Sequence, residues 1–104
     1  MKWVYLFNIE GTSIYKIGYT TREPDKRLNN VQVGCPFKLS IASTYDSKHG
    51  TKLEGILHRT YQLLRTTDEY VDSVLPGIRL RGEWFFLSKE IVDGFQSKCK
   101  EIED

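Results

Sequence analysis

The chain has 104 residues, of which 39% are hydrophobic and 28% are charged, and its formal net charge is +1. No apolar run approaches the ~20 residues that cross a bilayer, which argues against a membrane protein. The near-neutral charge excludes a globally basic surface, so a polyanion would have to bind to a local basic patch. We interpret residues 1–104 as a single domain that is long enough to bury an ordinary core.

Local patterns predict four strands and three helices. Runs rich in β-branched and aromatic residues predict strands, namely residues 3–9, 14–20, 37–45 and 83–87. Helical spacing and capping residues predict helices, namely residues 24–33, 47–65 and 88–102. Residues 66–82 carry charges and a Pro-Gly pair without periodicity, so we expect a long irregular loop. The expected fold is a small α+β domain with an antiparallel sheet flanked by helices.

The first two strands predict a hairpin with Gly11-Thr12 as a two-residue turn. Paired residues then have numbers that sum to 23, so Lys16 lies opposite Phe7 and Gly18 opposite Tyr5. Tyr5 and Lys16 become diagonal neighbours on one face, about 7–8 Å apart at the backbone. Lysine is depleted in strands. Lys16 is therefore either a lysine that reaches water from a half-exposed face or a functional cation.

Two further groups of charged residues carry open alternatives. Glu54 and His58 are i, i+4 neighbours on the expected helix 47–65. The pair is either part of a solvated helix flank or one arm of a Mg²⁺ site. Arg27 on the expected helix 24–33 is either an exposed cation or a clamp for a phosphate. Arg79, Arg81, Lys48 and Lys52 could extend a basic surface toward a nucleic-acid backbone.

The N-terminal residues enter a strand-like pattern directly, without the apolar segment and cleavage site of a secretory signal. We therefore expect a cytoplasmic protein. Cys35 and Cys99 lie far apart and form no CxxC pair, so we expect reduced thiols rather than a disulfide or a zinc site.

Taken in order and spacing, the segments "YKIGYTTREPDKRL", "LEGILHRTY" and "RGEWFFL" resemble the GIY-YIG nuclease superfamily. The resemblance is to the branch that reads KIG in the second motif, the small domains called T5orf172 or MUG113-like, and it covers residues 3–88. It implies a three-stranded antiparallel sheet flanked by helices, with a phosphodiesterase site that uses a single Mg²⁺ or Mn²⁺ ion. It also implies a DNA endonuclease that is associated with phages or mobile elements.

The resemblance implies a role for each matching residue. Tyr5 acts near the attacking water as a base or relay, and Lys16 lowers the pKa of that tyrosine or orients the water. Arg27 stabilises the phosphate charge, Glu54 holds the metal ion, and His58 substitutes for a group that other members supply. The chain departs from the pattern at Val31, where many relatives carry His or Tyr. We further expect six residues to contact nucleic acid, namely Lys16, Tyr19, Arg27, Lys48, Arg65 and Arg81.

Two alternatives to an endonuclease remain open. One is a catalytically weak or inactive nucleic-acid-binding module of the same fold, in which phosphate contacts would make affinity fall steeply with salt. The other is a protein-interaction domain in which Trp3, Trp84 and Phe85 are interface anchors rather than core residues. Sequence-specific cleavage by so short a chain would require a homodimer or a partner protein.

Overall fold

The computed structural model describes residues 2–77, 80 and 82–104. Within these residues, an antiparallel sheet has the strand order β3-β1-β2-β4. The strands are β1 Trp3–Ile9, β2 Ile14–Thr20, β3 Leu39–Asp46 and β4 Trp84–Phe86. The expected α+β class is confirmed, and the sheet has a fourth strand beyond the three that the resemblance implied. That strand, β4, pairs with only the first three residues of β2. Within the described residues, the rest of the outer edge of β2 has no strand partner.

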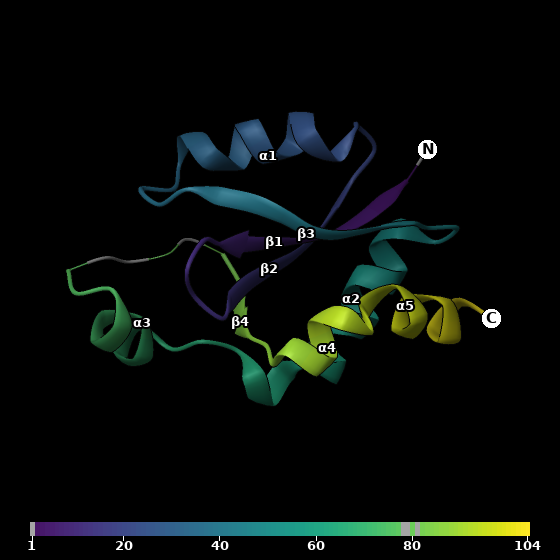
Figure 1. Cartoon of the computed structure of the whole chain (residues 1–104). Coiled ribbons are helices and arrows are strands. Elements are labelled where there is room, and N and C mark those ends of the chain that lie inside the picture. Colours follow the sequence, from purple (N-terminus) through teal and green to yellow (C-terminus); the bar gives the residue numbers. More distant parts are fainter. Residues whose placement is uncertain (1, 78–79, 81) are drawn as a thin grey trace.

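Helices cover both faces of the sheet. They are α1 Pro24–Val33, α2 Gly50–Thr60, the 3₁₀ helix η1 Gln62–Leu64, α3 Asp68–Val74, α4 Lys89–Asp93 and α5 Phe95–Glu103. Figure 1 shows α1 on one face, while α2, α4 and α5 lie together on the opposite side. None of the helices in the described part of the chain is both long and apolar enough to span a bilayer.

The hairpin register agrees with the sequence, because Tyr5 pairs with Gly18 and Phe7 pairs with Lys16. The predicted two-residue turn is wrong, since β1 ends at Ile9 and β2 begins at Ile14. The Thr12 N–H donates to the Ile9 carbonyl at 3.1 Å. Gly11 therefore takes the third position of a four-residue turn with φ at 81°, which glycine adopts without strain. Two- and four-residue loops give the same pairing sums, so the register was unaffected.

The two faces of the sheet bury separate clusters. On the face of α2 and α5, the buried side chains come from the sheet and both helices, namely Val4, Leu6, Ile17, Leu53, Leu57, Phe85, Leu87, Phe95 and Cys99. On the face of α1, a second cluster consists of Ile9, Ile14, Leu39 and Trp84, against which Leu28 and Val31 of α1 pack. Trp84 and Phe85 are 3% and 1% exposed. These two aromatic residues are therefore core residues rather than interface anchors.

Three helix predictions need correction. The expected loop 66–82 contains α3, which begins where the Thr67 side chain accepts a hydrogen bond from the Tyr70 N–H at 3.1 Å. The apolar pattern of α3 is sparse because only Val71 is buried. The expected helix 88–102 has its predicted cap at Ser88 but is interrupted at Gly94. The expected helix 47–65 begins at Gly50, ends at Thr60, and is followed by η1.

Candidate active site

Tyr5 lies in the middle of the sheet on the face that α1 covers. Its side chain is only 1% exposed, and its ring stacks on Phe7 with 3.9 Å between centroids and 18° between planes. The ring extends across Gly18, where an added Cβ would overlap the Tyr5 hydroxyl. Gly18 is therefore needed because any side chain at this position would displace the tyrosine.

Arg27 reaches the Tyr5 hydroxyl from α1. The half-buried arginine donates a hydrogen bond from Nε to the tyrosine oxygen at 3.5 Å. The remaining guanidinium nitrogens are thus held beside the hydroxyl, in the fork that suits a phosphate. The structure brings together two predicted site residues that are 22 positions apart.

Lys16 lies beside this pair, on the same face of β2. Its ammonium is 5.4 Å from the centre of the Trp84 ring, which belongs to the paired residue of β4. Burial and then the neighbouring charge of Arg27 lower the pKa of Lys16, while the carboxylates of Glu54 and Glu83 act in the opposite direction. The charges of Arg27, Glu54 and Glu83 therefore all lie close enough to act on one amine.

A cavity of about 230 Å³ opens between α1 and the β2–β4 edge of the sheet. Its lining consists of Lys16, Arg27, Asn30, Val31, Gly34, Cys35, Leu80 and Trp84. The charged groups among them are the two cations, Lys16 and Arg27. Such a pocket suits a phosphate group, because it offers two positive donors on a partly apolar floor.

α2 brings Glu54 to the outer edge of β2. At its first turn, Gly50 lies against the Tyr19 ring, and near its end the His58 Nε2 donates to the Ile17 carbonyl at 2.8 Å. Glu54 lies on the same side of the helix as His58 and midway between these contacts. Among the residues that the structure describes, none forms a hydrogen bond or ion pair with the Glu54 carboxylate.

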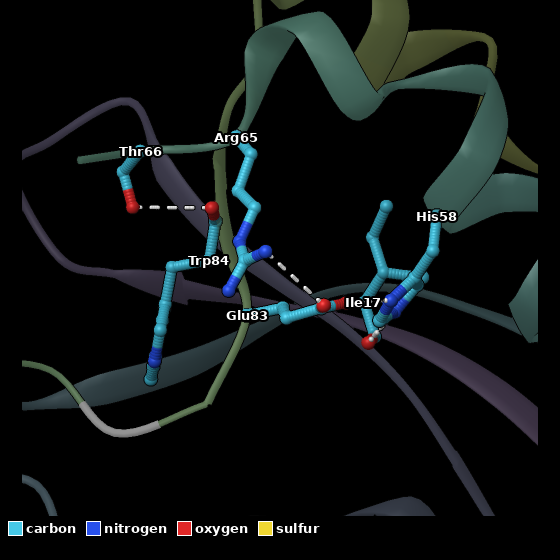
Figure 2. Close-up of polar contacts among 6 residues, drawn as sticks. All are labelled: Ile17, His58, Arg65, Thr66, Glu83 and Trp84. Atoms are coloured by element: carbon cyan, nitrogen blue, oxygen red, sulfur yellow. Dashed lines mark hydrogen bonds and ion pairs between the residues drawn. The ribbon is translucent and has the colours of Figure 1, made fainter.

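His58 takes part in a polar cluster at the same edge (Figure 2). Its Nδ1 contacts Oε2 of Glu83, the residue that precedes β4. The other oxygen of Glu83 lies 3.4 Å from the Nη1 of Arg65. Both ring nitrogens of His58 and both oxygens of Glu83 are therefore occupied.

The chain matches the model of the T5orf172 domain over residues 2–100. It belongs to the T5orf172 domain family. No curated protein and no solved structure matches the chain. Membership of this family is consistent with a nuclease-like or DNA-binding module, and it confirms the resemblance to T5orf172 domains.

The predicted nucleic-acid contacts of the T5orf172 domain do not all gather at the cavity. Tyr19 points to the opposite face, where its ring contacts Gly50. Lys48 is exposed just before α2 and Arg65 pairs with Glu83. Arg81, like Arg79, lies outside the described residues. Of the five that the structure describes, Lys16 and Arg27 line the cavity.

Within the described part of the chain, Glu54 is the carboxylate of the candidate site without a hydrogen bond or ion pair. Within the described residues, no group of three or more His, Cys, Asp or Glu side chains is placed to hold a metal ion. Such a donor set does not fit zinc, which takes three or four protein ligands. It fits Mg²⁺, which keeps several waters and is commonly bound through one or two carboxylates and the phosphates of the substrate.

Glu83 is the site residue that sequence reasoning missed. It lies in "RGEWFFL", one of the segments that carried the resemblance, but no role was assigned to it. Its partners His58 and Arg65 are 25 and 18 residues away, so no local spacing links them. The one available signal was an acidic residue directly before an aromatic strand.

Proposed function

We propose that this T5orf172 domain is a metal-dependent endonuclease of the GIY-YIG type that hydrolyses phosphodiester bonds in DNA. The observation that supports the proposal most strongly is that Lys16 and Arg27 line one cavity while Arg27 also donates a hydrogen bond to the Tyr5 hydroxyl. These residues come from β1, β2 and α1, and Glu54 lies close enough for its charge to act on Lys16.

In this proposal, the scissile phosphate occupies the cavity and is bound by the Arg27 guanidinium. Water attacks the phosphorus, and the bond to the leaving sugar oxygen breaks. The Tyr5 hydroxyl, which Arg27 already holds, orients the attacking water. Lys16, whose pKa is lowered by burial and by the charge of Arg27, receives the proton of that water when its amine is neutral.

Glu54 would hold the single Mg²⁺ or Mn²⁺ ion. When bound, such an ion lowers the pKa of a coordinated water and stabilises charge on the phosphate oxygens. Two features support Glu54 over Glu83 for this role. Both Glu83 oxygens already contact His58 and Arg65, whereas the Glu54 carboxylate has no such partner among the described residues.

The test is a plasmid nicking assay with Mg²⁺ or Mn²⁺, in which Glu54→Gln is compared with wild type. We expect nicking to fall at least ~100-fold, because an amide is a far weaker ligand than a carboxylate and the loss of even outer ligands costs 10–100-fold. The matched control is Glu69→Gln on the exposed surface of α3, which should nick like wild type. Equal nicking by Glu54→Gln and wild type would contradict the role of Glu54.

A second candidate function is a nucleic-acid-binding module that does not cleave. It is favoured by the two cations that line the cavity, because Lys16 and Arg27 need no metal ion to bind a phosphate. Binding would then weaken steeply with salt and would be unchanged by a chelator. If wild type nicks no DNA but binds it in this way, this second function replaces the first.

A further inference from the structure

The two hydrogen-bond partners of His58 indicate which of its ring nitrogens donate. Nε2 faces the Ile17 carbonyl at 2.8 Å, and Nδ1 faces the Glu83 carboxylate. A carbonyl oxygen and an ionised carboxylate can only accept hydrogen bonds. Both ring nitrogens must therefore donate, which requires the doubly protonated imidazolium form of His58.

Charges on every neighbouring element face this histidine. Glu83 before β4 is the acceptor, and Nη1 of Arg65 after η1 lies 3.4 Å from the second Glu83 oxygen. Among the described residues, the charges of Glu54 on α2 and of Glu83 also act on Lys16, which precedes Ile17 in β2. The side chains of His58 and Glu83 are 22% and 42% exposed, so the pair is only partly shielded from water.

The position of the pair follows from the sheet register. β4 pairs with β2 so that Lys16 lies opposite Trp84. One more step in the same register would place Ile17 opposite Glu83, but β4 begins only at Trp84, the residue after Glu83. The His58 ring lies between the Ile17 carbonyl and the Glu83 carboxylate instead, as Figure 2 shows. A side chain thus replaces the strand partner at the point where strand pairing stops.

The segment around Arg65 fixes Glu83 from the other side. The Thr66 N–H donates to the Trp84 carbonyl at 2.8 Å, and Arg65 forms an isolated antiparallel bridge with Phe85. The His58 ring also packs edge-on against Phe85, with 5.1 Å between ring centroids. The Glu83 carboxylate is therefore held between two cationic side chains rather than pointing freely into water.

We propose that Glu83 is a positioning residue that holds His58 in its doubly protonated form on the Ile17 carbonyl. The chain segment so fixed includes Lys16 and Gly18, the residues on either side of Ile17. Fixing Ile17 thereby keeps the Lys16 amine in place and keeps Gly18 where the Tyr5 ring can extend across it. This inference rests on the proposed function for its effect on cleavage, but not for the contact itself.

The contact is tested on the ¹⁵N-labelled full chain by NMR of the histidine ring nitrogens at pH 7. The chain has two histidines, and exposed His49 is the internal reference. We expect wild-type His58 to carry protons on both ring nitrogens, and Glu83→Gln to leave one ring proton, because the anionic acceptor is gone. A single ring proton on wild-type His58 would overturn the inference.

The positioning effect is tested on the same samples. In Glu83→Gln, the backbone amide signals of Lys16, Ile17 and Gly18 should shift, whereas the Glu69→Gln control should leave them unchanged. Glu83→Asp keeps the charge on a shorter side chain and should restore part of the effect. Unchanged signals in Glu83→Gln would overturn the positioning role.

The effect on cleavage is read in the nicking assay. We expect Glu83→Gln to lower kcat about tenfold with KM within twofold, as for other residues that orient a functional group. If Glu83→Gln nicks like wild type while Glu54→Gln is inactive, the positioning role in cleavage fails and the proposed function stands. If wild type nicks nothing, the proposed function and that role fail, and the ring-proton result alone decides the contact.

Discussion

α1 and α2 each bring one charged side chain to the candidate site, but they are attached to the sheet differently. α2 buries Leu53 and Leu57 in the larger cluster. α1 contains no buried residue and packs through half-buried Leu28 and Val31. Glu54 is therefore held on a firmly anchored helix, while Arg27 is held on a helix with fewer buried contacts. In the proposed nuclease, this arrangement would fix the metal ligand and leave the phosphate clamp able to adjust.

The difference predicts unequal costs for the same substitution in the two helices. Leu57→Ala should lower the free energy of unfolding by about 3 kcal/mol, because Leu57 is fully buried and a cavity would remain. Leu28→Ala on α1 should cost about 1 kcal/mol, because Leu28 is only half-buried and loses less area from water. Urea denaturation of both variants measures the difference. Equal costs would mean that α1 is anchored as firmly as α2.

The sheet between the two helices has its own sensitive position at Gly18. Gly18→Ala should lower the free energy of unfolding by about 2 kcal/mol, because the new methyl group would overlap the Tyr5 ring, which Phe7 backs. Thermal unfolding measures this cost. Gly34→Ala is a suitable control because the nearest atom to an added Cβ is 3.9 Å away. A stable Gly18→Ala variant would show that Tyr5 moves aside easily and is not fixed for its proposed role.

The smallest effect is expected where α2 begins. The Glu103 carboxylate of α5 accepts hydrogen bonds from the Ser47 hydroxyl at 2.7 Å and from the N–H groups of Lys48 and His49 at 3.0 and 2.9 Å. Burial acts to raise the pKa of Glu103, but these hydrogen bonds outweigh it and hold the pKa below its ordinary value of 4.5. The carboxylate is therefore a better acid in the folded chain than in the unfolded one.

The sign of the pH dependence follows from this shift. Glu103 contributes its full stabilisation above about pH 4.5, and the contribution is lost as the pH falls through the folded value. Glu103→Gln should therefore melt below wild type at pH 7, and the two melting temperatures should converge at lower pH. A difference that stays constant with pH would show that the charge of Glu103 does not matter.

The elements that the sequence predicted well are those whose signals are local. The register of β1 and β2 followed from a turn centred on Gly11-Thr12, and α1 has the bounds that Pro24 and Gly34 indicated. α3 was missed because a seven-residue helix with one buried side chain carries too little apolar periodicity. The interruption at Gly94 was missed because a single glycine within a helical pattern is often tolerated.

The contacts of the candidate site likewise include some that local patterns predict and others that depend on tertiary packing. Placing Tyr5 and Gly18 opposite each other needed only the hairpin register, and the structure agrees. The contact between Arg27 and Tyr5 needed the packing of α1, which spacing alone does not give. The partnership of Glu83 with His58 depends on where β4 begins, and this starting point is set by tertiary packing rather than by any residue pattern near it.

The polar cluster at the edge of β2 also bears on how the chain folds. It joins His58 to a carbonyl 41 residues earlier and to a carboxylate 25 residues later. Contacts of this separation form only after long loops have closed, so their entropy cost delays them relative to the hairpin. Tyr5, Lys16, Arg27 and Glu54 all precede β4 in the chain, yet the edge that carries Lys16 is secured only once β4 has docked. The site is completed at the end of folding, when the first and last thirds of the chain meet.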